Sequence, residues 1–116
     1  MSCLFCQTVR KEAPAEIIYE DEKIIVFNNI KPKAPTHLLI TTKEHIVSVA
    51  HLADKDRDLA GQLILTGQRI AREREINGYK LIFNVGKDGG QMIEHLHLHL
   101  LAGWRTPEER DLPGMP

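Results

Sequence analysis

The sequence has no apolar run close to the roughly 20 residues needed to cross a bilayer, and no basic segment followed by an apolar stretch at its N-terminus. We therefore expect no membrane association and no secretion signal. It also lacks internal repeats and low-complexity segments. Its formal net charge is only −1 over 116 residues, which argues against a nucleic-acid partner bound through bulk charge. These absences predict one globular domain, residues 1–116.

Cysteine is scarce as well, and the only two, Cys3 and Cys6, form a C-x-x-C pair. Without an export signal we expect a cytoplasmic protein, in which structural disulfides are rare. Two thiolates at this spacing can bind one zinc ion. A redox pair or two buried thiols fit the same spacing, so the pair alone leaves three alternatives open.

Most of the local patterns predict strands. β-branched and aromatic residues flank a polar turn at 20–23, which indicates two strands within 16–30. A loop with two prolines covers 31–36. Three more strands are expected at 37–42, at 79–85 and in the histidine-rich segment after residue 94. Five strands, mostly in adjacent pairs, predict an α+β fold with an antiparallel sheet.

One long helix is predicted between the third and fourth strands, because apolar residues there follow an i, i+3, i+4, i+7 stripe. Asp54 is its expected N-cap and Asn77-Gly78 its expected C-terminal stop. Gly67 lies on the apolar stripe, where it would permit close packing on the sheet. A short helix or turn is expected at 3–12, and the proline-rich tail after Gly103 is expected to be irregular.

Three histidines alternate with three leucines in HLHLHLLAG, residues 95–103. Side chains alternate between the two faces of a strand, so His95, His97 and His99 share one face and the leucines the other. Such histidines can bind a metal, or can supply a nucleophile with acid–base groups beside it. His95 and His99 would start about 13 Å apart along a strand, a wide span for a single ion.

A glycine-rich loop, GKDGGQ at 86–91, leads directly into this strand. Glycines leave backbone N–H groups unobstructed, so an anion can approach them closely. Such a loop is more often only a turn. Its position before the histidines favours a phosphate bound beside an imidazole.

These segments together resemble the histidine triad family, and most closely its Hint branch. The resemblance rests on HLHLHLL, NVGKDGGQ, KPKAPTHLLI and YEDEKIIVF and spans nearly the whole chain. It implies an α+β fold with a five-stranded antiparallel sheet, one long helix and a short N-terminal helix. It further implies a homodimer with joined sheets, no organic cofactor, and hydrolysis at the α-phosphate of purine nucleoside phosphoramidates or AMP conjugates.

The resemblance also implies roles for residues. His97 matches the nucleophile that forms a nucleotidyl-histidine intermediate, and its other ring nitrogen should donate to a carbonyl. His99 matches the residue beside the leaving group, and His37 another active-site histidine. For the apolar members of the expected nucleotide site, a plain core role remains an alternative. The expected nucleotide-binding residues are Asn84, Gly90, Gln91, Met92, Phe5, Phe27, Asn28, Asn29 and Ile30, with the backbone N–H groups of Gln91 and Met92 facing the phosphate.

Two residues depart from the family pattern. Met92 stands where a serine is common, so a hydroxyl contact to the phosphate is lost. Asn29 stands where an aspartate is common, so binding to the ribose hydroxyls would be weaker. Both departures bear on substrate affinity more than on the type of reaction.

Some members of the family carry a structural zinc ion held by a cysteine pair, a histidine after the third strand and the first triad histidine. The matching residues here are Cys3, Cys6, His45 and His95. A closed Cys₂His₂ tetrahedron of this kind would be structural. Two other functions stay open: a zinc-dependent hydrolase with the triad around a catalytic ion, and a non-catalytic nucleotide-binding protein.

Overall fold

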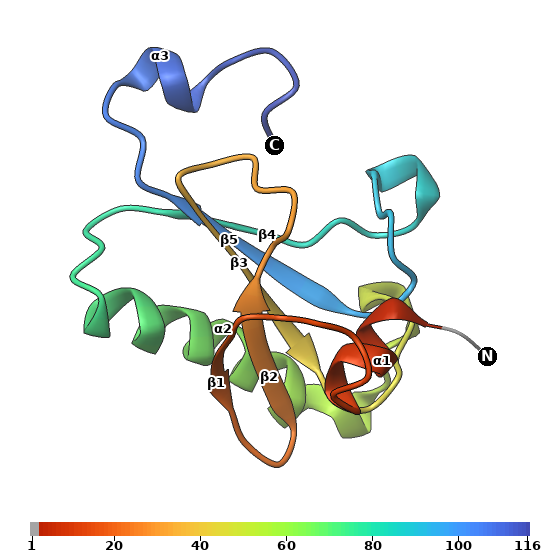
Figure 1. Cartoon of the computed structure of the whole chain (residues 1–116). Helices are drawn as coiled ribbons and strands as arrows, with labels where there is room; N and C mark the ends of the chain where they lie inside the picture. The colour runs from red at the N-terminus through yellow and green to blue at the C-terminus, as the bar shows by residue number, and fades with distance from the viewer. Residues whose placement is uncertain (1–2) are drawn as a thin grey trace.

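The computed structural model describes residues 3–116, so Met1 and Ser2 of the predicted domain lie outside it. Figure 1 shows a twisted sheet with one long helix against it. The strands are β1 (Ile17–Glu20), β2 (Ile24–Asn28), β3 (Thr36–Thr42), β4 (Lys80–Ile82) and β5 (His97–Ala102). The helices are α1 (Leu4–Val9), α2 (Arg57–Glu73) and α3 (Pro107–Arg110), with short 3-10 turns at Val49–His51, Asp54–Asp56 and Lys87–Gly89.

The five strands form one sheet in the order β1-β2-β3-β5-β4, and every neighbouring pair is antiparallel. This confirms the predicted fold class. β5 is the last strand in the sequence, yet it lies between β3 and β4. The histidine strand is therefore central, with a neighbour on each side.

The leucines that alternate with the triad histidines in β5, Leu98 and Leu100, face α2, as the alternation predicts. Leu98 and Leu100 are buried in the main core together with Ile40 and Leu63. Gly67 lets α2 approach the sheet closely, because a Cβ atom there would lie 3.0 Å from Ile40 Cδ1. The opposite face carries a smaller apolar cluster, against which α1 packs. Its buried members are Cys3, Phe5, Ile25, Phe27 and Leu39.

Both predicted ends of the long helix were wrong. The helix begins after a 3-10 turn, and Asp56 rather than Asp54 accepts a hydrogen bond, from Ala53 N–H at 2.9 Å. It ends at Glu73, before Asn77-Gly78, and Glu75 takes a left-handed conformation with φ of 58°. Ile76 packs against the core, and this tertiary contact stops the helix before the stronger local signal is reached.

The C-terminal half differs from prediction in three places. β4 has three residues instead of seven. His95 lies just before β5 rather than within it. The tail contains a short helix, α3, in which Thr106 Oγ1 accepts from Glu109 N–H at 3.2 Å. In residues 3–116 no helix has the length and apolar character needed to cross a membrane.

Candidate functional site

Four metal-binding side chains meet where α1 approaches the start of β5. The Sγ and nitrogen atoms of Cys3, Cys6, His45 and His95 all lie within 4.8 Å of one another. Four of these separations lie between 3.2 Å (Cys6 Sγ to His45 Nδ1) and 3.5 Å (Cys6 Sγ to His95 Nδ1). A tetrahedral Cys₂His₂ zinc site requires S···N and N···N separations of about 3.3–3.6 Å. The cluster therefore fits a zinc ion.

The tautomer of His95 is fixed by the main chain. Its Nε2–H donates to the carbonyl oxygen of Thr42 at 2.6 Å, so Nδ1 is unprotonated and faces the two thiols. The side chain is 0% exposed, and this burial lowers its pKa, which favours the neutral form that binds metals. A carbonyl in this position orients a ligand histidine before any ion arrives.

Helix α1 brings both cysteines to the sheet. Cys3 is the N-cap of α1, and its Sγ accepts from Cys6 N–H at 3.4 Å. Phe5, between them, is buried and anchors the helix. Its ring lies 5.3 Å from that of Phe27 and 5.0 Å from that of His97, edge to face in both cases. The helix that supplies the two cysteines of the cluster therefore also packs on the next triad histidine.

His97 is oriented by the backbone carbonyl of His95. Its Nδ1–H donates to that oxygen at 2.6 Å, which is the hydrogen bond that the sequence predicts. The side chain is 7% exposed, and its burial lowers the pKa below the ordinary value for histidine. At neutral pH the ring is therefore uncharged, with the lone pair on Nε2.

His37 and His99 form a second pair, with His37 Nε2 and His99 Nδ1 2.9 Å apart. The backbone N–H of Lys33 donates to His37 Nδ1 at 3.0 Å, so a neutral His37 carries its proton on Nε2 and donates it to His99. His99 then carries its own proton on Nε2. Its ring centroid lies 4.9 Å from that of His97. The strand thus places an imidazole lone pair and an imidazole N–H side by side.

Burial keeps His99 uncharged. Desolvation is the first cause that lowers its pKa to about 4, followed by repulsion from His97 and His37 in their protonated forms and from Lys33. The pKa of His37 is lowered as well, mainly by burial and then by the charge of Lys33. At neutral pH the pair therefore works as a chain of neutral hydrogen-bond donors that ends at His99 Nε2.

Gln91 differs from its predicted role. Its backbone N–H donates to Gly86 O at 3.0 Å, so it is committed to the loop and does not point at a phosphate. Its Oε1 accepts from Gly86 N–H, and its Nε2 donates to Val47 O at 2.7 Å and to Ile93 O at 2.9 Å. The backbone of a tight glycine turn must satisfy its own N–H groups, and Gln91 helps to do so. Gln91 therefore stabilises the conformation of the glycine loop through its hydrogen bonds.

The other loop residues are placed as follows. Asn84 follows β4, and its Nδ2 donates to Gly89 O at 3.0 Å. Gly90 has a φ of 84°, which glycine adopts without strain. The side chain of Met92 is 89% exposed. Among residues 3–116, its backbone N–H makes no hydrogen bond.

The residues expected at the nucleoside are divided in the structure. Phe5 and Phe27 are buried beside the triad, and Asn28 ends β2, whereas Ile30 is 77% exposed. Asn29 lies next to His37: its backbone N–H donates to His37 O at 2.9 Å. Its Oδ1 accepts from Lys31 N–H at 2.9 Å, so this oxygen is already engaged within the loop. A nucleoside-binding role for this set stays a prediction.

Comparison with known proteins decides the family. The model of the HIT domain family matches residues 10–106. Protein HitA of Neisseria gonorrhoeae is 41% identical over 102 residues, which cover 87% of this chain and 95% of HitA. The chain belongs to the histidine triad (HIT) family. The predicted family is therefore confirmed.

Solved HIT structures share the fold. A HIT family hydrolase from Legionella pneumophila superposes with a TM-score of 0.86 at 40% identity, covering 90% of this chain and 95% of the other. A zinc-bound histidine triad family protein from Mycobacterium smegmatis superposes with a TM-score of 0.80 at 34% identity, covering 93% and 79%. The Cys3, Cys6, His45 and His95 cluster fits the C-x-x-C zinc site predicted for this HIT chain.

Several atoms that orient the histidines of the HIT site belong to the backbone, so no residue type in the sequence indicates them. The carbonyl oxygens of His95 and Thr42 fix two tautomers, and the backbone N–H of Lys33 fixes a third. Any residue could supply the carbonyl oxygens and any residue except proline the N–H, so only the fold reveals them. The packing of Phe5 on His97 has a weak signal, namely the aromatic residue inside C-x-x-C.

Proposed function

We propose that this chain is a cytoplasmic, homodimeric hydrolase with a single HIT domain over residues 1–116. It releases AMP from purine nucleoside phosphoramidates or AMP conjugates. The observation that carries the proposal is the hydrogen bond from His97 Nδ1–H to His95 O, because it directs the lone pair of Nε2 into the site. The Legionella pneumophila relative is named a hydrolase, which supports the reaction class.

The first step is attack by His97 Nε2 on the α-phosphorus. A P–N(His97) bond forms, the bond to the leaving amine breaks, and the amine takes a proton from His99 Nε2. The products are a nucleotidyl-His97 that carries a positive charge, a free amine, and an anionic His99, which the charge on His97 and the N–H of His37 Nε2 would stabilise. The chain of neutral donors described above supports this role, because it presents N–H rather than a lone pair at His99.

Water completes the cycle. It attacks the same phosphorus, gives one proton to His99 Nε2 and releases AMP, so both histidines return to their starting state. The free backbone N–H of Met92, at the end of the glycine loop, would donate to a phosphate oxygen as negative charge builds up. Phe5, Phe27, Asn28, Asn29 and Ile30 would receive the nucleoside.

We assign the Cys₂His₂ cluster to a structural zinc ion, with no organic cofactor. Bound zinc would cross-link α1 to the segment that enters β5. The match between the separations of the Cys₂His₂ cluster and tetrahedral zinc geometry supports this, as does the zinc-bound relative from Mycobacterium smegmatis. A catalytic zinc held by all three triad histidines has less support, because His95 Nδ1 faces the thiols and His97 Nδ1 is bonded to a carbonyl.

The test follows adenosine phosphoramidate by phosphorus NMR. The parent protein should release AMP, and His97→Ala should lose this activity by several orders of magnitude while keeping its zinc and its circular dichroism spectrum. His51→Ala is the matched control, because His51 is exposed and, within residues 3–116, its side chain bonds only to Ser48 Oγ. Light scattering should give twice the chain mass of 13.2 kDa.

Two results would overturn the proposal. Equal rates for the parent and His97→Ala, with no nucleotidyl adduct trapped, would favour a non-catalytic nucleotide-binding protein. Loss of activity on chelation while the fold and dimer persist would favour a zinc-dependent hydrolase.

A further inference from the structure

The Cys₂His₂ cluster lies on three separate segments of the chain. Helix α1 carries Cys3 and Cys6, His45 follows β3, and His95 comes just before β5. The cysteines contact partners that lie 39 and 92 positions later in the sequence. A zinc ion in the cluster would therefore cross-link segments that the chain itself connects only over long distances.

Two of these segments hold the proposed nucleophile. Phe5, between the two cysteines, packs edge to face on His97, with the ring centroids 5.0 Å apart. The carbonyl oxygen of His95 accepts the hydrogen bond that orients the His97 ring. A displacement of α1 or of His95 would thus reach His97 directly, without any intermediate residue.

The third segment holds the glycine loop and the start of β5. Directly after His45, the carbonyl oxygen of Ile46 accepts from Leu96 N–H at 2.6 Å. The next carbonyl oxygen, that of Val47, accepts from Gln91 Nε2–H at 2.7 Å. Gln91 in turn stabilises the glycine loop. The segment that carries His45 therefore supports the loop proposed to bind the phosphate.

The two cysteines are placed so that they can form a disulfide. Both are free thiols, and their Sγ atoms lie within 4.8 Å of each other, against about 2.05 Å in a disulfide. Rotation about the Cα–Cβ bonds can close such a gap. Cys3 is only 9% exposed, whereas Cys6 is half-buried, so an oxidant in solution reaches Cys6 first. Cys3 then lies beside it as the second, resolving thiol.

We propose that Cys6 and Cys3 form a site of reversible oxidation, at which a peroxide converts the pair into a disulfide, expels zinc and slows hydrolysis. The inference rests on the proposed function and on the zinc assignment. The Cys6 thiolate first attacks one oxygen of hydrogen peroxide. The O–O bond breaks, Cys6 becomes a sulfenic acid and hydroxide leaves. The Cys3 thiolate then attacks Cys6 Sγ, the S–S bond forms and a second hydroxide leaves. The two sulfur atoms give up two electrons, the peroxide takes both, and zinc stays Zn²⁺.

The disulfide cannot replace the metal cross-link. It closes a short loop within α1, whereas zinc would join α1 to His45 and His95. Once both thiolates are consumed, two neutral imidazoles remain, too few ligands to hold zinc tightly. The segments are then free to shift relative to β5, and with them the contacts to His97 and to Gln91. We expect kcat to fall by about 10-fold or more, because a misplacement of about 1 Å can cost about 10²-fold in rate.

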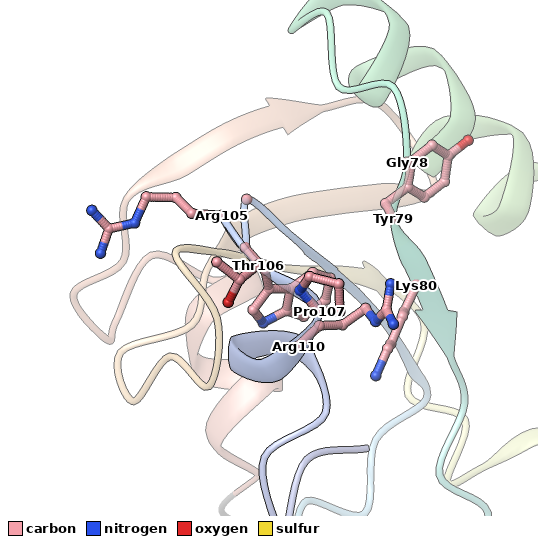
Figure 2. A pocket seen from close by; sticks show the side chains of 9 residues that line it. Gly78, Tyr79, Lys80, Arg105, Thr106, Pro107 and Arg110 are labelled. Atoms are coloured by element: carbon pink, nitrogen blue, oxygen red, sulfur yellow. The ribbon is translucent and has the colours of Figure 1, made fainter.

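The far end of β5 supplies an internal reference for the fold. A cavity of about 390 Å³ lies there, between β4, the end of β5 and α3 (Figure 2), and the single tryptophan of the chain, Trp104, lines it. Among residues 3–116, no cysteine, histidine or methionine lines this cavity. Trp104 Nε1 is buried, so its fluorescence reports whether this end stays folded. A local change at the cluster should leave the emission unchanged, whereas general unfolding should shift it to longer wavelength.

The test adds hydrogen peroxide to the reduced, zinc-loaded protein. Free thiols, released zinc, intact mass and the rate of AMP release from adenosine phosphoramidate are followed together. One zinc ion should leave for each pair of thiols lost, with a mass decrease of about 2 Da. The rate should fall in step with the thiols, and the melting temperature should drop by more than about 5 °C. Dithiothreitol together with zinc should restore the thiols, the mass, the melting temperature and the rate.

Two variants and one trapping reagent sharpen the test. Cys6→His keeps a possible metal ligand but cannot form the disulfide, so it should retain zinc, and its rates before and after peroxide should be in a ratio near one. His51→Ala changes a histidine outside the cluster and should respond as the parent does. Dimedone, which reacts with sulfenic acids, should label Cys6 in preference to Cys3. Should Cys6→His fail to fold, the thiol, zinc and mass measurements on the parent still decide.

The outcomes separate this inference from the proposed function. If the reduced parent releases no AMP, the proposed function fails, while the thiol and zinc measurements still test the oxidation site. If peroxide leaves the thiols and zinc in place, if the disulfide form is as active as the reduced form, or if Cys6→His loses zinc as fast as the parent, the inference is refuted alone. A reduced parent without zinc refutes the zinc assignment and this inference together. A shift of the Trp104 emission would indicate general unfolding and would also refute it.

Discussion

Acid should destabilise this protein through His99 in a range of pH that the structure defines. The folded protein holds the pKa of His99 at about 4, against an ordinary 6.5. The difference of about 2.5 pH units corresponds to about 3.4 kcal/mol at about 1.36 kcal/mol per unit. His99 is partly buried, and burial is the first cause of the shift, so we take this as an upper figure.

The direction follows from which state binds the proton first. Below pH 6.5 the unfolded chain protonates His99 while the folded protein does not, so the free energy of unfolding falls as the pH falls. The loss begins near pH 6.5, reaches about 2.5 kcal/mol at pH 4.5 and stops once the folded protein also takes up the proton near pH 4. Above pH 6.5 this contribution is constant.

The assay is urea unfolding followed by circular dichroism at pH 7.5, 6.5, 5.5 and 4.5, on the parent and on His99→Asn. The asparagine Oδ1 can accept from His37 Nε2–H as His99 Nδ1 does, but it does not titrate. Zinc release in acid affects both proteins, so it cancels in the difference. The parent should lose up to about 2.5 kcal/mol more than the variant by pH 4.5.

Parallel losses of stability in the two proteins would contradict this reasoning. They would show that His99 titrates near its ordinary pKa in the folded state. The neutral N–H donor that the proposed mechanism requires at His99 would then have no support from burial.

Two further predictions concern the metal cluster and the helix packing. Chelation should lower the melting temperature of the parent but barely change that of Cys6→Ser, which should bind little zinc by elemental analysis; equal shifts in both would contradict the zinc assignment. Gly67→Leu should cost about 1–3 kcal/mol in urea unfolding because Ile40 occupies the space. Gly61→Ala, in the same helix with nothing within 4 Å, should instead gain up to about 1 kcal/mol, and equal effects would disprove the close contact.

Local periodicity was sufficient for the sheet and for the faces of the histidine strand. The alternation of apolar and polar side chains along a strand depends only on neighbouring residues, so it can be read without knowing what packs around the strand. The end of α2 could not be predicted from neighbouring residues alone. Asn77-Gly78 is a strong local stop signal, but the helix ends earlier, because Ile76 packs against the core and Glu75 turns the chain. Such a tertiary contact has no counterpart in a sequence window.

The cysteine and histidine positions of the metal cluster could be predicted because the family pattern names them. Side-chain identity could not predict how Gln91 stabilises the glycine loop, since the hydrogen bonds of such a loop depend on its dihedral angles. The pairing of Lys33 N–H with His37 was equally hidden. It depends on a backbone atom that every residue except proline possesses.

The order of strands in the sheet has a consequence for how the protein is made. β5 is synthesised last, yet it lies between β3 and β4. Cys3 meets a partner 92 positions later in the chain, at His95. On the ribosome, β1 to β3 can pair as they emerge, while β4 waits without a neighbour. We therefore expect folding to close with the insertion of one strand, and that strand and the residues just before it bring the proposed nucleophile, its proposed proton donor and the last histidine of the Cys₂His₂ cluster in a single step.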